Sequence, residues 1–551
     1  MKLILSLAGI AIFFNLMTVV GQNRVFNNPI IPGFYPDPSI CRVGENYYLV
    51  NSSFEYFPGS PIFQSKDLVH WKQIGNILDR PNQLALDSVK YGVSGIFAPS
   101  IRYHNGTYFM TTTMIGSHNP QRGGNFIVTA KMPEGPWSDP FFLDNAPGID
   151  PCIFFDSDDK AYFIGARMAN DKEKKYWKHS IIWMRELDLN KMQLLGDEIV
   201  ILEQGGALHH ARNAESPRLF KRNGYYYLII AEGGTGKEHA VTVFRSKDIR
   251  GPYETNLRNP ILTNRHMGLK YPIQSVGHAD LVETPLGEWW MVVLGTRPDA
   301  DGTINLARET FLVPMIWEND WPVASPVSGC VSMQCQAPRL PVFYYESEES
   351  KNNFDKDSLP LYWNYIRLPE SENYSLKERK GYLRLHLSAI TLKQELSPTF
   401  VGRRQQHSNC LAETFLEFVP NKNGESAGLV VFQSPECYYK LEKTKRNERN
   451  CLVLTKCDKG EECIQEEVEY TLDRVGLRVI ALGQRYSFFY SVDGEEWNML
   501  GDIQDGRILN AYYNGKGFTG LYIGMYASSN GSKSSLCADF DSFEYRECFV
   551  D

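Results

Sequence analysis

Polar and hydrophobic residues follow one recurring pattern through the N-terminal part of the chain. Each copy starts with a polar or small residue, usually followed by proline, and continues with a short apolar strand, a turn and a second strand rich in Tyr, Phe and Trp. The five copies are DPSICRVGENYYLV from Asp37, APSIRYHNGTYFMT from Ala98, DPCIFFDSDDKAYFI from Asp150, ESPRLFKRNGYYYLII from Glu215 and HADLVETPLGEWWMVV from His278. Turns such as Asn105-Gly106 and Asn223-Gly224 are typical of tight β-hairpins. The pattern therefore predicts a hairpin in every copy.

These hairpins predict a five-bladed β-propeller over residues 22–330, because a strand–turn–strand repeat of this size is typical of propeller blades. The alternative is a set of unrelated hairpins in an aromatic-rich β protein. In a propeller the first strand of every blade lines the central channel, so residues at the same point of these strands face one another. Those residues are Asp37, Ala98, Asp150, Ser216 with Glu215 beside it, and His278. Three carboxylates and a histidine are thus expected at one mouth of the channel.

The C-terminal half has a different pattern. After a plausible linker near 325–345, stretches such as AGLVVFQ, RVIALGQRYSFFYSVDGEEW and GLYIGMYAS alternate between apolar and polar positions. Period-two alternation with regular turns predicts a sandwich of two antiparallel sheets over residues 340–551. The fold class expected for the whole chain is therefore all-β, a propeller followed by a β-sandwich.

Length and charge narrow the function. A chain of 551 residues is long enough for two hydrophobic cores. Its formal net charge is −8 and it has no long basic run, so nucleic acid is not an expected partner. A neutral ligand does not require a basic surface and is compatible with this composition. The sequence leaves the oligomeric state open, a homo-oligomer included.

The first residues look like a targeting segment. Residues 1–21, MKLILSLAGIAIFFNLMTVVG, combine one lysine, an apolar run and small residues near the end. This arrangement predicts a secretory signal peptide and a secreted or periplasmic protein, the alternative being an uncleaved anchor. No other stretch of the sequence is apolar for long enough to span a bilayer.

Cysteine spacing argues against a structural zinc site. All 11 cysteines follow the signal segment, and no CxxC…CxxC pattern occurs. Cys330 with Cys335 and Cys457 with Cys463 could close short disulfide loops in an oxidising compartment, although pairing does not follow from sequence.

Converging carboxylates have two main uses, to bind a hard cation or to hydrolyse a bond by acid and base. Calcium loops usually supply several oxygens from one short stretch, whereas these acids lie far apart along the chain. Hydrolysis of a glycosidic bond needs one protonated carboxyl group and one ionised one, roughly 6.5 to 9.5 Å apart in inverting enzymes. A third carboxylate nearby raises the pKa of the acid by repulsion.

The residues closely resemble those of glycoside hydrolase family 43. The motifs NPIIPGFYPDPSI, SSFEYFPGSPIFQSKDLVHW, GIFAPSIRYHNGTYF, GIDPCIFF, AESPRLF and GHADLVET…GEWW occur in the family's order, and the likeness continues past residue 340 to the end. The resemblance implies an inverting, exo-acting hydrolase that releases β-D-xylose, α-L-arabinofuranose or both from neutral xylan-derived oligosaccharides. It also implies a concanavalin-like sandwich and no required cofactor.

The resemblance assigns catalytic roles to three acids. By their positions in the motifs, Asp37 would be the general base, Glu215 the general acid and Asp150 the group that tunes the pKa of the acid and orients it. The longer side chain of glutamate suits an acid that must reach a leaving oxygen from one residue farther back.

Five further residues match positions that bind substrate in similar proteins. Phe54 and Phe97 would form apolar walls around the terminal sugar, and Phe518 would come from a sandwich loop that shortens the pocket. Arg297 matches an arginine placed against sugar hydroxyls and a catalytic carboxylate. His278 would lie deep in the channel and fix waters, with a structural calcium ion as a further option. Each also has a plain structural reading, as core, salt bridge or buried histidine.

Two alternatives remain open from sequence. One is a propeller that binds carbohydrate without cleaving it, and the other is a related hydrolase that acts on arabinan or another plant glycan. The presence of all three acids favours a hydrolase. Phe97-Ala98-Pro99-Ser100 departs from the family's usual Trp-Ala-Pro-Asp at this point, so the substrate preference stays open.

Overall fold

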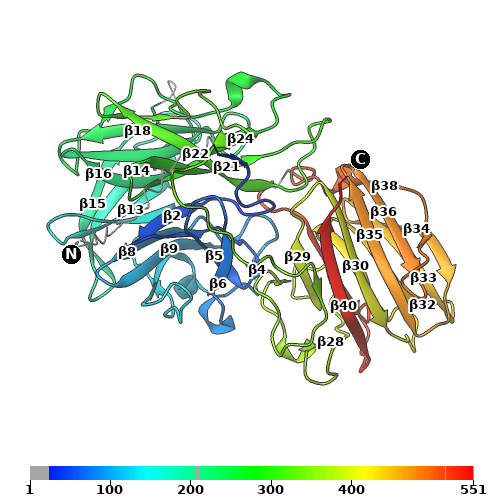
Figure 1. The fold of residues 1–551 in the computed structure, drawn as a ribbon. Coiled ribbons are helices and arrows are strands. Elements are labelled where there is room, and N and C mark those ends of the chain that lie inside the picture. Colours follow the sequence, from blue (N-terminus) through cyan, green and yellow to red (C-terminus); the bar gives the residue numbers. More distant parts are fainter. Residues whose placement is uncertain (1–23, 88, 207–210, 516, 550–551) are drawn as a thin grey trace, which may run out of the picture.

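The computed structural model describes residues 24–87, 89–206, 211–515 and 517–549, and the regular secondary structure within them consists almost wholly of strands (Figure 1). The expected signal peptide, residues 1–21, lies outside the described residues. Within them, no helix combines the length and the apolar character needed to cross a membrane. The helical turns are all short 3-10 segments: η1 (Pro81–Gln83), η2 (Pro120–Arg122), η3 (Arg265–Met267), η4 (Ser371–Asn373) and η5 (Gly506–Leu509).

The N-terminal half forms five antiparallel blade sheets, whose strands follow one another along the chain except that blade I omits β4. Blade I contains β2 (Ser39–Val43), β3 (Asn46–Val50), β5 (Gly59–Ser65) and β6 (Lys72–Leu78). Blade II contains β7 (Gly95–Ile96), β8 (Ser100–His104), β9 (Thr107–Ile115), β10 (Gly124–Ala130) and β11 (Phe141–Phe142). Blade III contains β12 (Ile149–Phe155), β13 (Ala161–Met168), β14 (Ser180–Asp188) and β15 (Gln193–Leu202). Blade IV contains β16 (Glu215–Arg222), β17 (Tyr225–Glu232), β18 (Ala240–Ser246) and β19 (Glu254–Thr255), and blade V contains β20 (Gln274–Glu283), β21 (Trp289–Thr296), β22 (Arg308–Glu318) and β23 (Trp321–Ala324).

The predicted five-bladed propeller is confirmed. The first long strands of the blades, β2, β8, β12, β16 and β20, contact one another in a closed ring around the centre. The predicted hairpins are present as well. Asn105 and Asn223 have φ values of 45° and 49° and are each followed by a glycine of positive φ, the backbone that a two-residue hairpin turn requires.

The two ends of the propeller are held together outside the blades. Strand β1 (Val25–Asn27) pairs with β24 (Gln334–Gln336), which follows blade V. The Asn28 side chain donates to the carbonyl of Leu312, 3.0 Å away, and accepts from its N–H at 2.9 Å. The start of the chain thus fastens the last blade, although it adds no strand to it.

The C-terminal half is the predicted sandwich of two antiparallel sheets (Figure 1). One sheet contains β25 (Lys351–Asn352), β27 (Tyr374–Ser375), β28 (Leu383–His386), β30 (Asn409–Glu417), β35 (Arg474–Leu482), β36 (Arg485–Ser491), β37 (Asn498–Met499), β38 (Gln504–Asp505) and β40 (Cys537–Glu547). The other contains β4 (Tyr56–Phe57), β26 (Asn364–Ile366), β29 (Phe400–Arg404), β31 (Ser426–Ser434), β32 (Cys437–Arg446), β33 (Arg449–Asp458), β34 (Glu461–Glu469) and β39 (Tyr522–Ser528). One large apolar cluster fills the space between them.

Strand β4 joins the halves in a way that the sequence pattern did not predict. It lies within the chain of blade I, yet Tyr56 and Phe57 pair with Ile366 and Tyr365 at the edge of a sandwich sheet. The ring of Tyr56 also stacks on that of Tyr522, with centroids 3.9 Å apart. Residues of both halves therefore share one buried cluster, which fixes the sandwich against the propeller.

All eleven cysteines are free thiols. The two short disulfide loops considered from the sequence, Cys330 with Cys335 and Cys457 with Cys463, are therefore not formed in this structure.

Candidate active site

Four of the five repeats place the same backbone feature at one end of the channel. Asp37, Asp150, Ser216 and His278 have φ values of 55°, 57°, 54° and 53°. The pairing register shifts at the same points of β12, β16 and β20. Positive φ is unfavourable for residues that carry a side chain, and such irregularities redirect side chains and cluster at functional sites. The recurring motif of the sequence thus corresponds to a recurring device that turns polar side chains toward the channel mouth.

Asp37 is buried and receives hydrogen bonds on both oxygens. Arg308 Nη1 donates to Oδ1 at 2.8 Å, and the Ser52 hydroxyl donates to Oδ2 at 2.5 Å. The Nδ1 atom of His278 lies 3.6 Å from Oδ1. Both oxygens of Asp37 are thus fixed by donors, and the hydrogen bond from Arg308 is charge-assisted.

Asp150 and Glu215 lie close together, and the pKa of each is raised. The backbone N–H of Ser216 donates to Asp150 Oδ2 at 3.1 Å. Burial, followed by repulsion from Asp150, raises the pKa of Glu215 to about 8. Burial, followed by repulsion from Asp37, raises the pKa of Asp150 to about 7. Glu215 therefore keeps its proton near neutral pH, as a general acid requires. The structure brings the three predicted acids together.

The predicted apolar wall is also present. The Phe54 ring stacks on Phe518 with centroids 5.7 Å apart and contacts Phe97 at 5.2 Å. Phe54 is fully buried, whereas Phe97 and Phe518 remain partly exposed. Phe518 comes from the sandwich, and its carbonyl accepts a hydrogen bond from Arg308 Nη2 at 3.3 Å. The sandwich therefore supplies one side of the same site.

The arginine beside Asp37 is Arg308 and not Arg297, which the resemblance placed against a catalytic carboxylate. Arg297 forms a two-point ion pair with Glu309, at 2.6 and 2.8 Å, and Glu309 also accepts from the N–H of Gly33. Arg308 pairs with Asp37, and its guanidinium lies 5.6 and 5.3 Å from the ring centroids of Phe54 and Phe518. The physical reason is the strand register: Arg308 begins β22 at the channel, whereas Arg297 lies in the loop before it.

His278 lies next to Asp37, as the repeat predicted, and the guanidinium groups of Arg218 and Arg308 lie near it. Burial, together with Arg218, His239 and Arg308, holds the pKa of His278 well below its usual value, so the imidazole is neutral. A calcium ion takes about six to eight oxygen ligands, and two guanidinium groups repel it. These residues fit a neutral occupant such as water better than calcium. In the described part of the chain, no group of three or more His, Cys, Asp or Glu side chains could hold a metal ion.

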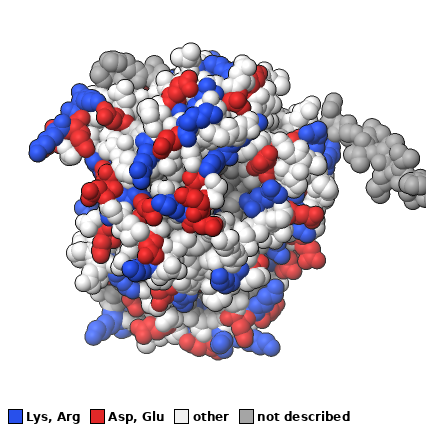
Figure 2. All heavy atoms as spheres, turned by 90° about the vertical axis from the view of Figure 1, so that its left-hand side faces the viewer, with Lys and Arg blue, Asp and Glu red and all other residues white. Residues whose placement is uncertain are grey.

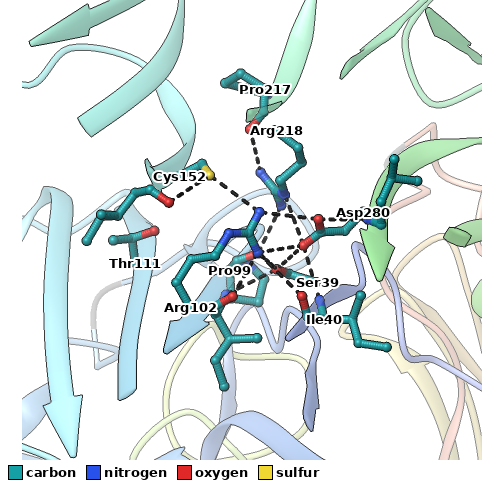
Figure 3. A network of polar contacts seen from close by, with 12 residues as sticks. Ser39, Ile40, Pro99, Arg102, Thr111, Cys152, Pro217, Arg218 and Asp280 are labelled. Carbon is teal, nitrogen blue, oxygen red and sulfur yellow. Dashed lines mark hydrogen bonds and ion pairs between the residues drawn. The ribbon is translucent and has the colours of Figure 1, made fainter. Parts of the chain in front are cut away.

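A buried ionic network lies deeper in the channel, two to four positions farther along each first strand (Figure 3). Asp280 accepts hydrogen bonds from the Ser39 hydroxyl at 2.6 Å and from Arg102 at 2.8 Å. Arg218 Nε is 3.6 Å from Asp280, and Arg102 Nη2 is 3.6 Å from the Cys152 sulfur. Each of the five blades thus contributes one side chain. Two guanidinium groups against one carboxylate leave a positive charge beneath the three acids of the mouth.

Sequence reasoning missed Arg308, Ser52 and Asp280. Arg308 and Asp280 lie in segments that read as ordinary strands, NLARETFLV and HADLVET, and the repeat directs attention to His278 instead. The sequence signal that could have identified them is a charged residue among the apolar residues of a blade strand, the first strand for Asp280 and the third for Arg308. Buried charges are rarely tolerated without a partner.

Comparison with known proteins agrees with this geometry. The sequence profile of glycosyl hydrolases family 43 matches residues 26–322, and that of the beta xylosidase C-terminal concanavalin A-like domain matches residues 351–546. The first profile covers the propeller, including all three acids, and the second covers most of the sandwich.

Three relatives illustrate the likeness over the full length. A xylosidase/arabinosidase of Butyrivibrio fibrisolvens is 41% identical, over 95% of this chain and 99% of that protein. A non-reducing end alpha-L-arabinofuranosidase of Bacteroides ovatus is 39% identical, over 95% of each chain. The crystal structure of a xylan beta-1,4-xylosidase from Bacillus halodurans superposes with a TM-score of 0.89 at 34% identity, covering 95% of this chain and all of that one. With propeller, carboxylates and sandwich all matched, the chain belongs to glycosyl hydrolases family 43.

Proposed function

We propose that this glycoside hydrolase is an exo-acting enzyme that releases a terminal pentose, β-D-xylose or α-L-arabinofuranose, from xylan-derived oligosaccharides and inverts the anomeric centre. The proposal rests on the different surroundings of Asp37 and Glu215, which lie at the same mouth of the propeller channel. Arg308 and Ser52 each donate a hydrogen bond to the Asp37 carboxylate, whereas burial and repulsion from Asp150 raise the pKa of Glu215 to about 8.

This contrast supplies both halves of a single displacement. Glu215 gives its proton to the glycosidic oxygen as the bond to the sugar breaks. A water molecule attacks the anomeric carbon from the opposite side and passes its proton to Asp37. Asp150 supports the acid through its charge and through the hydrogen bond from Ser216, which adjoins Glu215. Acid–base chemistry of this kind needs no cofactor.

The sandwich supports attack at chain ends. Phe518 closes on Phe54 and Phe97 and is tied to Arg308. The backbone of Ala511 bonds to Ile304 in the propeller at 2.9 Å, which anchors the same loop. Because the sandwich loop with Phe518 closes one side of the channel mouth, the site is better suited to a pocket for one terminal sugar than to an open groove.

The surface suits a neutral substrate. Figure 2 shows Lys and Arg interspersed with Asp and Glu over the face turned to the viewer, with no broad basic area there. We further propose that the protein is secreted or periplasmic, on the basis of residues 1–21, and that His278 helps to hold substrate or water beside Asp37.

Hydrolysis of two chromogenic substrates tests the function. The wild-type protein is expected to release 4-nitrophenol from 4-nitrophenyl β-D-xylopyranoside, α-L-arabinofuranoside or both. Binding of xylo-oligosaccharides without turnover of any pentoside would favour the non-catalytic reading. Turnover of arabinan oligosaccharides alone would favour the related hydrolase.

The pH profile tests the role of Asp150. In the wild type, kcat/KM should fall as pH rises through about 8, because Glu215 then loses its proton. Asp150→Asn removes a negative charge that raises the pKa of Glu215, so the alkaline limb should move to lower pH. A limb that stays in place or moves to higher pH would show that Asp150 does not tune the acid.

A further inference from the structure

One aromatic side chain stands out in the solvent near the channel mouth. The chain has 10 tryptophans, all within the described ranges, and Trp177 is the only one with a largely exposed side chain, at 64%. It lies between β13 and β14 of blade III. Tryptophan is highly buried on average, and it is enriched at binding surfaces where it is exposed.

The strand register places the Trp177 loop at the catalytic end of the propeller. Ala166, near the end of β13, pairs with Ile149, the neighbour of Asp150. The chain that follows β13, residues 169–179, therefore leaves the blade beside the acids and not at the opposite end.

This loop is fastened to the segment that leads into Glu215. The Tyr176 hydroxyl donates to the carbonyl of Ala211 at 3.0 Å. The backbone N–H of Asn213 donates to the carbonyl of Lys178, also at 3.0 Å. Both bonds flank Trp177 in the sequence, so its backbone is held against residues 211–213. Hydrogen bonds on both sides of Trp177 therefore hold this part of the loop in place.

Two cationic side chains lie over the Trp177 ring, which is still largely exposed. Lys178 Nζ lies 4.8 Å and the Arg212 guanidinium carbon 5.5 Å from the ring. Arg212 also pairs with Glu238 at 2.7 Å, from the loop after β17. A largely exposed indole beside hydrogen-bond donors and a carboxylate is chemistry that recognises a sugar ring and its hydroxyls.

The direction of the substrate then decides which sugar reaches Trp177. In the proposed reaction, the terminal sugar lies at the wall of Phe54, Phe97 and Phe518, next to Asp37. Glu215 must reach the leaving oxygen, so the leaving-group sugar extends past Glu215. Arg212 is three residues upstream, at most about 10 Å of extended chain.

Because this step rests on the proposed function, it concerns only the leaving-group side of that reaction. We infer that Trp177, with Arg212 and Glu238, forms a subsite that holds the leaving-group sugar of an oligosaccharide. The pyranose or furanose ring lies against the exposed indole face.

The test compares leaving groups with and without a sugar. The substrates are a trisaccharide of the pentose that the wild type releases, xylotriose or arabinotriose, and the corresponding pentosyl fluoride. Trp177→Ala should lower kcat/KM on the trisaccharide by about tenfold, the loss of one aromatic contact, and leave the fluoride within about twofold. Trp177→Phe should restore most of the loss. Leu257→Ala, at a 98% exposed position of blade IV, is the matched surface control.

A binding measurement gives a second readout. In the Glu215→Gln background, titration with the trisaccharide should change tryptophan fluorescence, and adding Trp177→Phe should remove most of that change. Equal losses on both substrates, or no loss on either, would overturn the subsite while the hydrolase function stands. Failure of the wild type to cleave either substrate would overturn the proposed function and the subsite with it.

Discussion

Asp37→Asn is expected to lower kcat by about 10³- to 10⁴-fold, near the upper range for loss of a general base. Asparagine has the same shape and keeps an oxygen for one of the two donors, Arg308 and Ser52. It cannot take a proton from water. KM should change little, because the residue contributes to the transition state more than to ground-state binding. Steady-state kinetics on the pentoside identified above measures both constants.

Two further measurements make this prediction specific. Azide needs no base, so it should restore turnover in Asp37→Asn and give a glycosyl azide as product. Ser52→Ala removes one hydrogen bond but no proton acceptor, and its loss should be much smaller. An Asp37→Asn variant with more than a tenth of wild-type kcat would remove Asp37 from the mechanism.

Glu215→Gln is expected to show a loss that depends on the leaving group. On an oligosaccharide, whose leaving alcohol needs a proton, kcat/KM should fall by about 10³- to 10⁴-fold. On a 2,4-dinitrophenyl pentoside, whose leaving group departs without one, the loss should stay within about tenfold. The alkaline limb near pH 8 should disappear too, since the group that titrates there is gone. Equal losses on both substrates would show that Glu215 is not the acid.

The fold and the three acids could be predicted because their signals are local. Each blade carries its own hairpin and its own residue at the mouth, so Asp37, Asp150 and Ser216, with Glu215 beside it, appear at one point of a repeating motif. The positive φ values at this point of the repeat turn the side chains toward the channel mouth.

The supporting contacts could not be predicted because they join distant parts of the chain. Arg308 meets Asp37 across 271 positions, and no spacing rule connects them. Arg297 was the weaker choice for the same reason, since its partner Glu309 is set by the register of β22. The two residues of β4 belong by sequence to blade I and by pairing to the sandwich, which only the assembled sheets reveal.

The central claim is that Asp37 and Glu215 act from opposite sides of the scissile bond in one displacement. Proton NMR of the first-formed sugar, recorded before mutarotation, tests this most directly. The account predicts the anomer opposite to that of the substrate, α-xylose from a β-xyloside. A first product with the substrate's own configuration would mean a covalent intermediate and would contradict the account.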